Sequence, residues 1–331
     1  MPRQADESNN GPSTEIVLMP DASRYAGQPV DVSSRRSIDI VLSGNGQEPI
    51  EPTHEHTVFD QFYHAGQFWR AVVPLDGIDN VFGQAFNFSK ARRGGTDREV
   101  LRDRHGVPKR SIRVLNHLQS RFTFRAGQSI WLYPLGGRAD GAPAHQLNDF
   151  VYSVEAVGPP GVTFNVRDAF GGNLIGAHRF LSTQQMVFER LVVQNQYVIE
   201  TPPLPLSDFE KRMLLSKSLL RSHFAGATEF YRLFGLFRTN NCTSNPFQIL
   251  DSVVDYTFFQ RMGSMFYRFP LSPRLYLRIR GMDSDPAVRK LVRDEFEDYI
   301  GHPETQKRKR EYVRQRTRDI RAARERRKPM R

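Results

Sequence analysis

A single cysteine and nine histidines are the side chains of this 331-residue chain that could support nucleophilic chemistry. Cys242 lies in a polar segment and is followed by residues with the apolar spacing of a helix. At the start of a helix, unpaired backbone N–H groups stabilise a thiolate and lower the pKa of the thiol. The alternative is an inert thiol buried in the core. Cys242 is therefore a candidate nucleophile, and it has no second cysteine with which to form a disulfide within the chain.

A nucleophilic thiol needs a nearby base, and His64 is the best candidate. It lies in an apolar, strand-like run close to Gly66, where a polar ring is not expected unless it has a function. The alternative interpretation is a hydrogen-bonded histidine in the core or at its rim. Asp76, Asp79 and Asn87 follow on the next turn and strand, and each could orient the imidazole.

A metal site is a second interpretation of the same region. His54, His56 and Asp60 precede His64 and could ligate a metal ion with it. Their spacing matches no common ligand pattern, and the competing interpretation is a solvated polar loop. We therefore expect no metal and no cofactor.

The elements that must position these residues change character along the chain. Alternating apolar residues predict strands first, and helical spacing follows from Ser207, where Ser207 and Glu210 form a capping-box pattern. Strands followed by helices predict an α+β fold with an antiparallel sheet packed against helices. The expected strands are 38–42, 57–73 as one strand, 81–88 as its hairpin partner, a pair in 122–133, a pair in 150–166, and 187–200; the expected helices are 207–220, 227–237, 246–256 and 285–301.

Three segments together resemble the Lnb N-terminal periplasmic domain family, also known as domain of unknown function 4105. Residues 59–88 resemble its aromatic-Gly-His-Ala strand and its later Gly-x-Phe-x-Phe strand. Residues 188–211 are similar to its Arg-bearing strand and following helix, and 231–243 resemble its Tyr-x-x-aromatic signature that ends in Asn-Cys-Thr. The resemblance covers residues 37–260.

The resemblance implies a circularly permuted papain-like fold of the NlpC and lecithin:retinol acyltransferase group. It implies thiol-dependent acyl transfer, or ester or amide hydrolysis, in which Cys242 forms a thioester and His64 is the general base. Asn241, in the Asn-Cys-Thr signature, and Asp79, on the turn before the second strand, complete the candidate catalytic set. The implied substrate carries an acyl group on a lipid, lipoprotein or peptide.

The net charge of +11 has one main source. Residues 304–331 contain 13 Lys and Arg against 4 Asp and Glu, so this tail holds most of the excess and the remaining chain is nearly neutral. The tail could contact an anionic partner, either nucleic acid or a membrane surface. The second functional hypothesis is therefore a non-catalytic binding or scaffold protein of the same fold that uses residues 307–331.

The expected organisation has four parts. These are a disordered leader at 1–36, the papain-like domain at 37–260, a helical extension at 261–302 and the basic tail at 303–331. The first residues lack the apolar stretch of a signal peptide, and no run of about 18 apolar residues predicts a membrane span. On this basis we expect a cytoplasmic protein.

Overall fold

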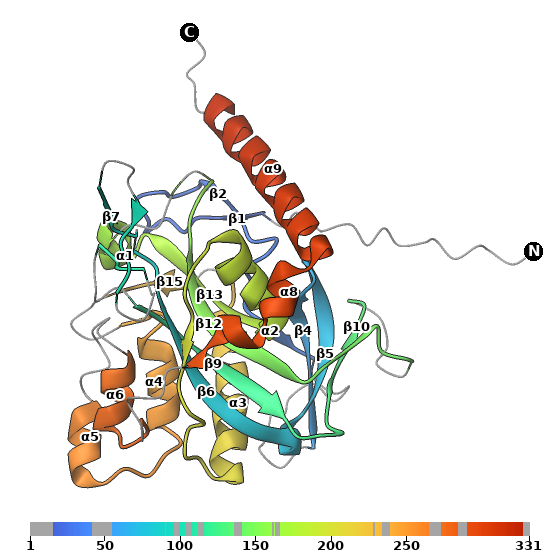
Figure 1. Ribbon diagram of the computed structural model, residues 1–331, viewed down its shortest axis with the longest axis vertical. Helices are drawn as coiled ribbons and strands as arrows, with labels where there is room; N and C mark the ends of the chain where they lie inside the picture. The colour runs from blue at the N-terminus through green and yellow to red at the C-terminus, as the bar shows by residue number, and fades with distance from the viewer. Residues whose placement is uncertain are drawn as a thin grey trace, which may run out of the picture.

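A large, mostly antiparallel sheet with helices on both faces organises the protein (Figure 1). The computed structural model describes residues 16–41, 55–89, 91–95, 99–103, 108–111, 116–135, 141–160, 162, 166–227, 229–233, 239–264, 273–283 and 290–326. The prediction of an α+β fold is confirmed at this level.

The sheet has twelve strands, and its main path runs β11-β10-β5-β4-β13-β12-β9-β6-β14-β16. β3 pairs with β4, and β15 pairs with β13. Among the described strands, β4 and β13 form the parallel pair of this sheet. The strands are β3 Asp39–Ile40, β4 His56–His64, β5 Gln67–Pro74, β6 Ile78–Asn87, β9 Asn116–Phe124, β10 Ile130–Tyr133, β11 His145–Leu147, β12 Asp149–Val157, β13 Leu174–Ser182, β14 Ile199–Glu200, β15 Phe230–Tyr231 and β16 Lys290–Leu291.

Side chains alternate between two buried faces along the central strands. In β12, Phe150 belongs to the larger hydrophobic cluster and Val151 to a second, separate cluster. In β13, Phe180 and Leu181 divide in the same way. A strand buried on both sides must be covered by helices on both sides, so the sheet forms the middle layer of three.

The first helical layer covers the face with the larger cluster. α3 Asp208–Ala225, α4 Ser244–Asp251 and α6 Pro273–Ile279 pack here, with α5 Phe258–Ser264 beside α6. The capping box that starts α3 is present, because the Ser207 side chain accepts the Glu210 N–H and the Glu210 carboxylate accepts the Ser207 N–H. This layer delivers the segment around Cys242 to the sheet.

The second helical layer covers the opposite face. It consists of α2 Thr183–Val187, the π-helical turn η2 Phe188–Val193, α7 Val292–Glu295, α8 Glu297–Gly301 and the first part of α9 Pro303–Arg326. α9 continues beyond this contact and projects from the body (Figure 1). The basic tail is thus a docked helix over its first turns.

The aromatic run 57–73 forms a hairpin and not the single strand that its alternation predicts. β4 reverses at Ala65 and Gly66 and returns as β5, so that Tyr63 pairs with Phe68. Both turn residues have positive φ, at 52° and 96°, which is the geometry of a tight two-residue hairpin turn. The sequence prediction missed this reversal because apolar residues continue through the turn.

Three further element predictions are corrected by the structure. β6 pairs with β9 and β14 and not with β5. Residues 187–193 are helical, since Ser182 caps α2 by accepting the Gln185 N–H. In the predicted helix 227–237, Phe230 and Tyr231 instead form β15.

The remaining elements lie at the periphery. The part of the expected leader from Ile16 onward is folded, with Met19 and Val30 buried against β12 and β13; residues 1–15 lie outside the described chain. Of the predicted helix 285–301, residues 285–289 also lie outside it, Lys290 and Leu291 form a strand, and two short helices follow, the second of which ends at Gly301. These elements are β1 Ile16–Leu18, β2 Pro29–Asp31, the 3-10 turn η1 Leu75–Gly77, β7 Arg93–Gly94, β8 Glu99–Val100 and α1 Val166–Gly171.

Candidate functional site

Cys242 lies one residue before Thr243, the N-cap position of α4, and its side chain is 1% exposed. The Tyr231 hydroxyl donates to its Sγ at 3.3 Å and accepts the Cys242 N–H at 3.4 Å. Burial raises the pKa of the Cys242 thiol, and the hydrogen bonds from neighbouring groups only partly oppose this. The helix start predicted from the sequence is present, but the thiol is held neutral.

Asn241 caps α4. Its Oδ1 accepts the backbone N–H groups of Thr243 and Ser244, both at 2.8 Å. Its Nδ2 donates to the carbonyl oxygens of Arg232 and Leu233. Asn241 therefore uses its amide to position the polypeptide, and both ends of that amide are occupied.

His64 ends β4, where its Nδ1 lies 2.8 Å from the Ser182 hydroxyl. The His145 ring packs edge-on against the His64 ring, with the two ring centroids 4.8 Å apart. Burial, with smaller contributions from the charges of His145 and Arg308, lowers the pKa of His64 to about 4. His64 is a neutral, buried imidazole at pH 7, and its hydrogen-bond partner is a hydroxyl.

The structure does not bring Cys242 and His64 together. Tyr63, next to His64, pairs with Leu181 near one end of β13, whereas Tyr231, which contacts the thiol, pairs with Leu174 at the other end. Seven residues of strand span roughly 23 Å. The thiol also lies 4.0 Å from the Asn116 carbonyl on β9, and β13 and β12 separate β9 from β4. This separation exceeds the roughly 3 Å that proton transfer requires.

The candidate third residues are also occupied elsewhere. Asp79 is exposed and accepts a hydrogen bond from the Asn80 side chain at 2.8 Å. Asp76 pairs with Arg212, and Asn87 accepts the backbone and side-chain donors of Ser89. The polar contact of the His64 ring therefore comes from Ser182 of β13, and the turn before β6 does not supply it.

The metal interpretation gains no support within the described part of the chain. No group of three His, Cys, Asp or Glu side chains there could hold a metal ion. Asp60 forms a two-pronged ion pair with Arg70, and His56 stacks on Trp131. His54 lies outside the described residues.

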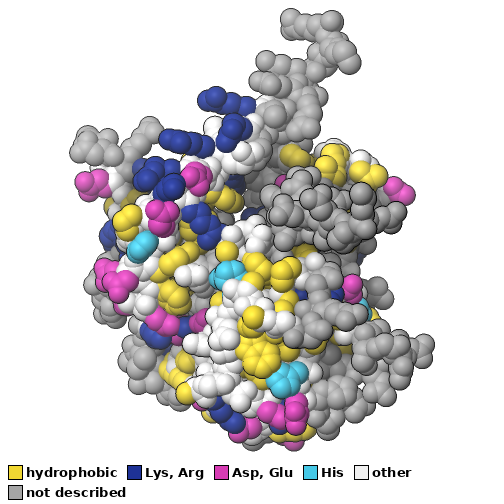
Figure 2. All heavy atoms as spheres, turned by 90° about the vertical axis from the view of Figure 1, so that its right-hand side faces the viewer, with side chains coloured by type: hydrophobic (Ala, Val, Ile, Leu, Met, Phe, Trp, Pro, Cys, Tyr) yellow, Lys and Arg dark blue, Asp and Glu magenta, His cyan; other side chains and the backbone are white. Residues whose placement is uncertain are grey.

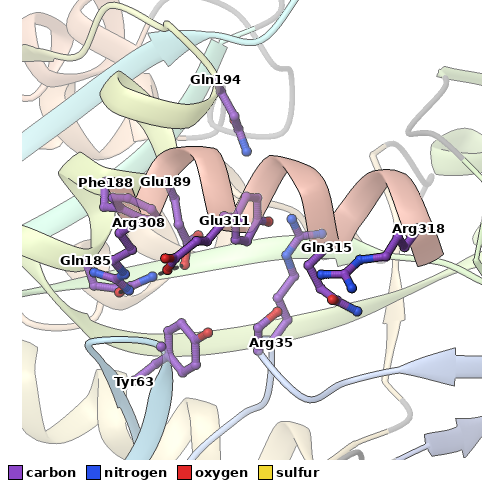
Figure 3. Close-up of a pocket in the computed structure, with 13 residues that line it drawn as sticks. Arg35, Tyr63, Gln185, Phe188, Glu189, Gln194, Arg308, Glu311, Gln315 and Arg318 are labelled. Carbon is purple, nitrogen blue, oxygen red and sulfur yellow. Dashed lines mark hydrogen bonds between the residues drawn. The ribbon is translucent and has the colours of Figure 1, made fainter. Parts of the chain in front are cut away.

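A hollow lies at the junction of α9 and the body. A cavity of about 520 Å³ is lined by residues from four separate segments. Figure 3 shows Arg35, Arg308 and Arg318 around it, with the carboxylates of Glu189 and Glu311. Sequence reasoning did not predict this cavity, since its walls come together only when α9 docks on η2.

Buried ion pairs form the base of this region. Arg179 is 1% exposed and contacts Glu155 at 2.7 Å and both carboxylate oxygens of Glu189. Burial opposes ionisation of Glu155, but the Arg179 and Arg190 guanidiniums outweigh it and hold its pKa well below the usual value. Charged residues within strand-like runs are the sequence signal that could have indicated this network.

Lys and Arg side chains gather along α9 (Figure 2), and three on its outward side have no partner among the described side chains. Arg310, Arg314 and Arg321 recur at helical spacing on one stripe, and all three are exposed. No carboxylate of the described side chains pairs with them. The stripe spans about 16 Å of helix at 1.5 Å per residue.

Comparison of the chain with known protein families, with curated proteins and with solved structures found no match in any of the three. The resemblance to the Lnb domain family therefore stays a prediction. Within the described residues, the structure contains no helix with the length and apolar character needed to cross a bilayer.

Proposed function

We propose that this protein is a non-catalytic binding module that contacts the phosphate backbone of nucleic acid through α9. The observation that carries the proposal is the stripe of Arg310, Arg314 and Arg321, which is exposed and unpaired among the described side chains. An exposed guanidinium contributes little to the stability of the fold. A row of unpaired guanidiniums is instead a surface suited to phosphates.

The side-chain composition of α9 favours nucleic acid over a membrane surface. A helix that lies on a bilayer needs an apolar face opposite its charged one. The apolar side chains of α9 whose exposure is described are few, and Tyr312 packs against Phe188 of η2. The side of α9 away from the body therefore supplies charge and hydrogen-bond donors with little apolar area.

The placement of Cys242 supports a finer proposal for the fold. A thiol directly before α4, packed on β9, is the arrangement expected of the permuted papain-like group. In this chain the nearest polar partner of the thiol is Tyr231, and His64 bonds Ser182. We therefore propose a papain-like body without thioester chemistry, which is the second of the two hypotheses drawn from the sequence.

The test is binding to a labelled duplex of about 20 base pairs, measured by fluorescence anisotropy over a range of salt concentrations. Each phosphate contact contributes about 0.9 to the slope of log K against log salt. The triple variant Arg310→Gln, Arg314→Gln, Arg321→Gln should weaken binding and lower this slope by about 2 to 3.

The matched control removes three exposed cations from the body. Arg92→Gln, Lys109→Gln and Arg278→Gln change the net charge by the same amount. This control should retain most of the affinity and of the slope. Equal losses in both triple variants would show that net charge and not α9 attracts the duplex, and tighter binding to anionic vesicles than to the duplex would contradict the choice of nucleic acid.

A further inference from the structure

The cavity between α9 and the body has the size of a small-molecule site. Its volume of about 520 Å³ falls within the usual range for ligand pockets, roughly 300–1,000 Å³. Its walls come from the Ser34–Arg35 segment, the β4–β5 hairpin, α2 with η2, and α9. None of these segments is adjacent to another in sequence except α2 and η2, so the site exists only in the folded chain.

One wall of the cavity is held rigidly. Gln185 accepts a hydrogen bond from Arg308 at 2.6 Å and donates to Glu189 at 2.9 Å. The Arg308 guanidinium lies 4.0 Å above the centre of the Phe188 ring. Glu189 in turn is fixed by Arg179. These groups already have partners, so they shape the cavity and contribute little new binding.

Other lining groups have no partner among the described residues. The carboxylate of Glu311, the guanidinium of Arg318 and the hydroxyls of Tyr63 and Tyr312 are in this state. Burial, with the charge of Glu189, raises the pKa of Tyr63 to about 12, so its hydroxyl remains a donor at pH 7. The cavity thus combines an unpaired anion, an unpaired cation and two hydroxyl groups.

The charges are separated within the cavity. Figure 3 shows Arg35 and Arg318 on the side away from Gln185, with Glu311 reaching toward Gln185 and Arg308. Arg35 keeps a single ion-pair contact, to Glu155 at 3.3 Å, which leaves guanidinium donors for a further acceptor. The lining holds three arginines against two glutamates, a net charge of +1.

We propose that this cavity binds a small zwitterion that carries a phosphate at one end and an amine at the other. The phosphate is recognised by Arg35 and Arg318, because guanidinium donors match phosphate oxygens. The amine is recognised by the Glu311 carboxylate next to the Tyr63 and Tyr312 rings, since aromatic faces and carboxylates both attract ammonium groups. A phosphomonoester with one amine has a net charge near −1 at pH 7, opposite to that of the lining.

The site and the nucleic-acid stripe share one edge at Arg318, which lines the cavity and lies four residues after Arg314 and three before Arg321. Arg310 and Arg314 lie on the outward side of α9, whereas Arg308, Glu311 and Tyr312 line the cavity. Glu311 is away from this edge, so Glu311→Gln should not weaken binding of the duplex. The two proposals can fail separately.

The experiment is titration calorimetry of the full chain with phosphoethanolamine, ethyl phosphate and ethylamine. We expect phosphoethanolamine to bind about tenfold more tightly than either single-charge compound, because only it satisfies both ends of the cavity. Arg318→Gln should weaken phosphoethanolamine about tenfold, and Arg316→Gln, on the same helix outside the lining, should not.

Glu311→Gln provides the sharper test. It should weaken phosphoethanolamine several-fold but strengthen ethyl phosphate, because the substitution removes a carboxylate that repels the anion. Glu304→Gln on the exposed first turn of α9 is the control, and neither affinity should change. If Glu311→Gln strengthened both compounds, the cavity would be an anion site and the zwitterion proposal would be overturned.

A second measurement distinguishes a free ligand from a lipid headgroup. Vesicles that contain phosphatidylethanolamine present the same amine and phosphate as a diester. Binding of free phosphoethanolamine assigns a soluble ligand, and Arg318-dependent binding of vesicles alone assigns a headgroup; both outcomes support a zwitterion site. Absence of both overturns it.

Discussion

Polar side chains at the two ends of the sheet differ in whether they have hydrogen-bond partners. At the Cys242 end, the amides of Asn241 and Asn245 form hydrogen bonds with neighbouring backbone and side chains, and the Tyr231 hydroxyl contacts the thiol. At the α9 end, Glu311 and Arg318 line an open cavity without partners among the described residues. Internally satisfied polar groups stabilise a fold, whereas groups left unsatisfied at a cavity are available to a ligand. The sequence predicted a site at the Cys242 end, whereas the structure has a cavity with unpartnered charged groups at the α9 end.

The largest effect is expected from breaking the buried ion pairs beneath the cavity. Arg179→Met leaves Glu155 and Glu189 without their shared guanidinium and should lower the free energy of unfolding by about 3 to 5 kcal/mol. Urea denaturation measures it. Arg125→Met removes an exposed pair with Asp208 and should cost less than about 1 kcal/mol. Similar losses for both variants would mean that the network beneath the cavity is not buried as described.

The second prediction concerns the reactivity of Cys242. Because the side chain is buried and its pKa is raised, alkylation of the folded protein should be at least about 100-fold slower than in urea. His64→Ala should not change the rate in the folded state, measured by mass spectrometry with iodoacetamide. Rapid alkylation that falls in His64→Ala would instead restore the thiol and imidazole pair predicted from the sequence.

Loss of the Asn241 contacts at the start of α4 should have an intermediate effect. Asn241→Ala removes the acceptor for two N–H groups at the start of α4 and should lower the free energy of unfolding by about 1 to 2 kcal/mol. Asn80→Ala, at a half-buried residue whose amide donates to its neighbour Asp79, should change it by less than about 0.5 kcal/mol. Chemical denaturation of both variants compares them, and equal effects would argue against a capping role.

The last effect is a pH dependence that originates at His64. Its pKa is about 4 in the folded protein and about 6.5 in an unfolded chain, so the unfolded state binds a proton that the folded state does not. The corresponding stability is complete above pH 6.5 and is lost as the pH falls toward 4. His64→Gln should flatten the slope of unfolding free energy against pH in this window, measured by urea denaturation at several pH values. An unchanged slope would show that His64 is not the group responsible.

The sequence predicted best where a signal is local. The capping box at Ser207 and Glu210 marked the start of α3, and the apolar stripe after Cys242 marked α4, which begins at Ser244. The prediction failed at 187–200, where an apolar run was interpreted as a strand but Ser182 starts a helix. Apolar runs buried in a sheet and in a short helix look alike in sequence, so local periodicity could not separate them.

The placement of the candidate site residues was beyond the sequence for a different reason. The sequence identified the correct local setting of Cys242, a polar segment before a helix, but it could not place Cys242 relative to His64. That distance depends on which strands lie between β4 and β9, and β12 and β13 are inserted there from residues much later in the chain.

By itself the sequence determined the α+β class, the helix start after the thiol and the concentration of positive charge at the C-terminus, because each depends on neighbouring residues or on composition. Only the tertiary structure decided which side chains meet. In the folded chain the Cys242 thiol contacts the Tyr231 hydroxyl, the His64 ring contacts the Ser182 hydroxyl, and a cavity lined by charged residues lies beneath α9. Such contacts join residues that are tens to hundreds of positions apart, and strand order and helix docking, which bring them together, are properties of the whole fold.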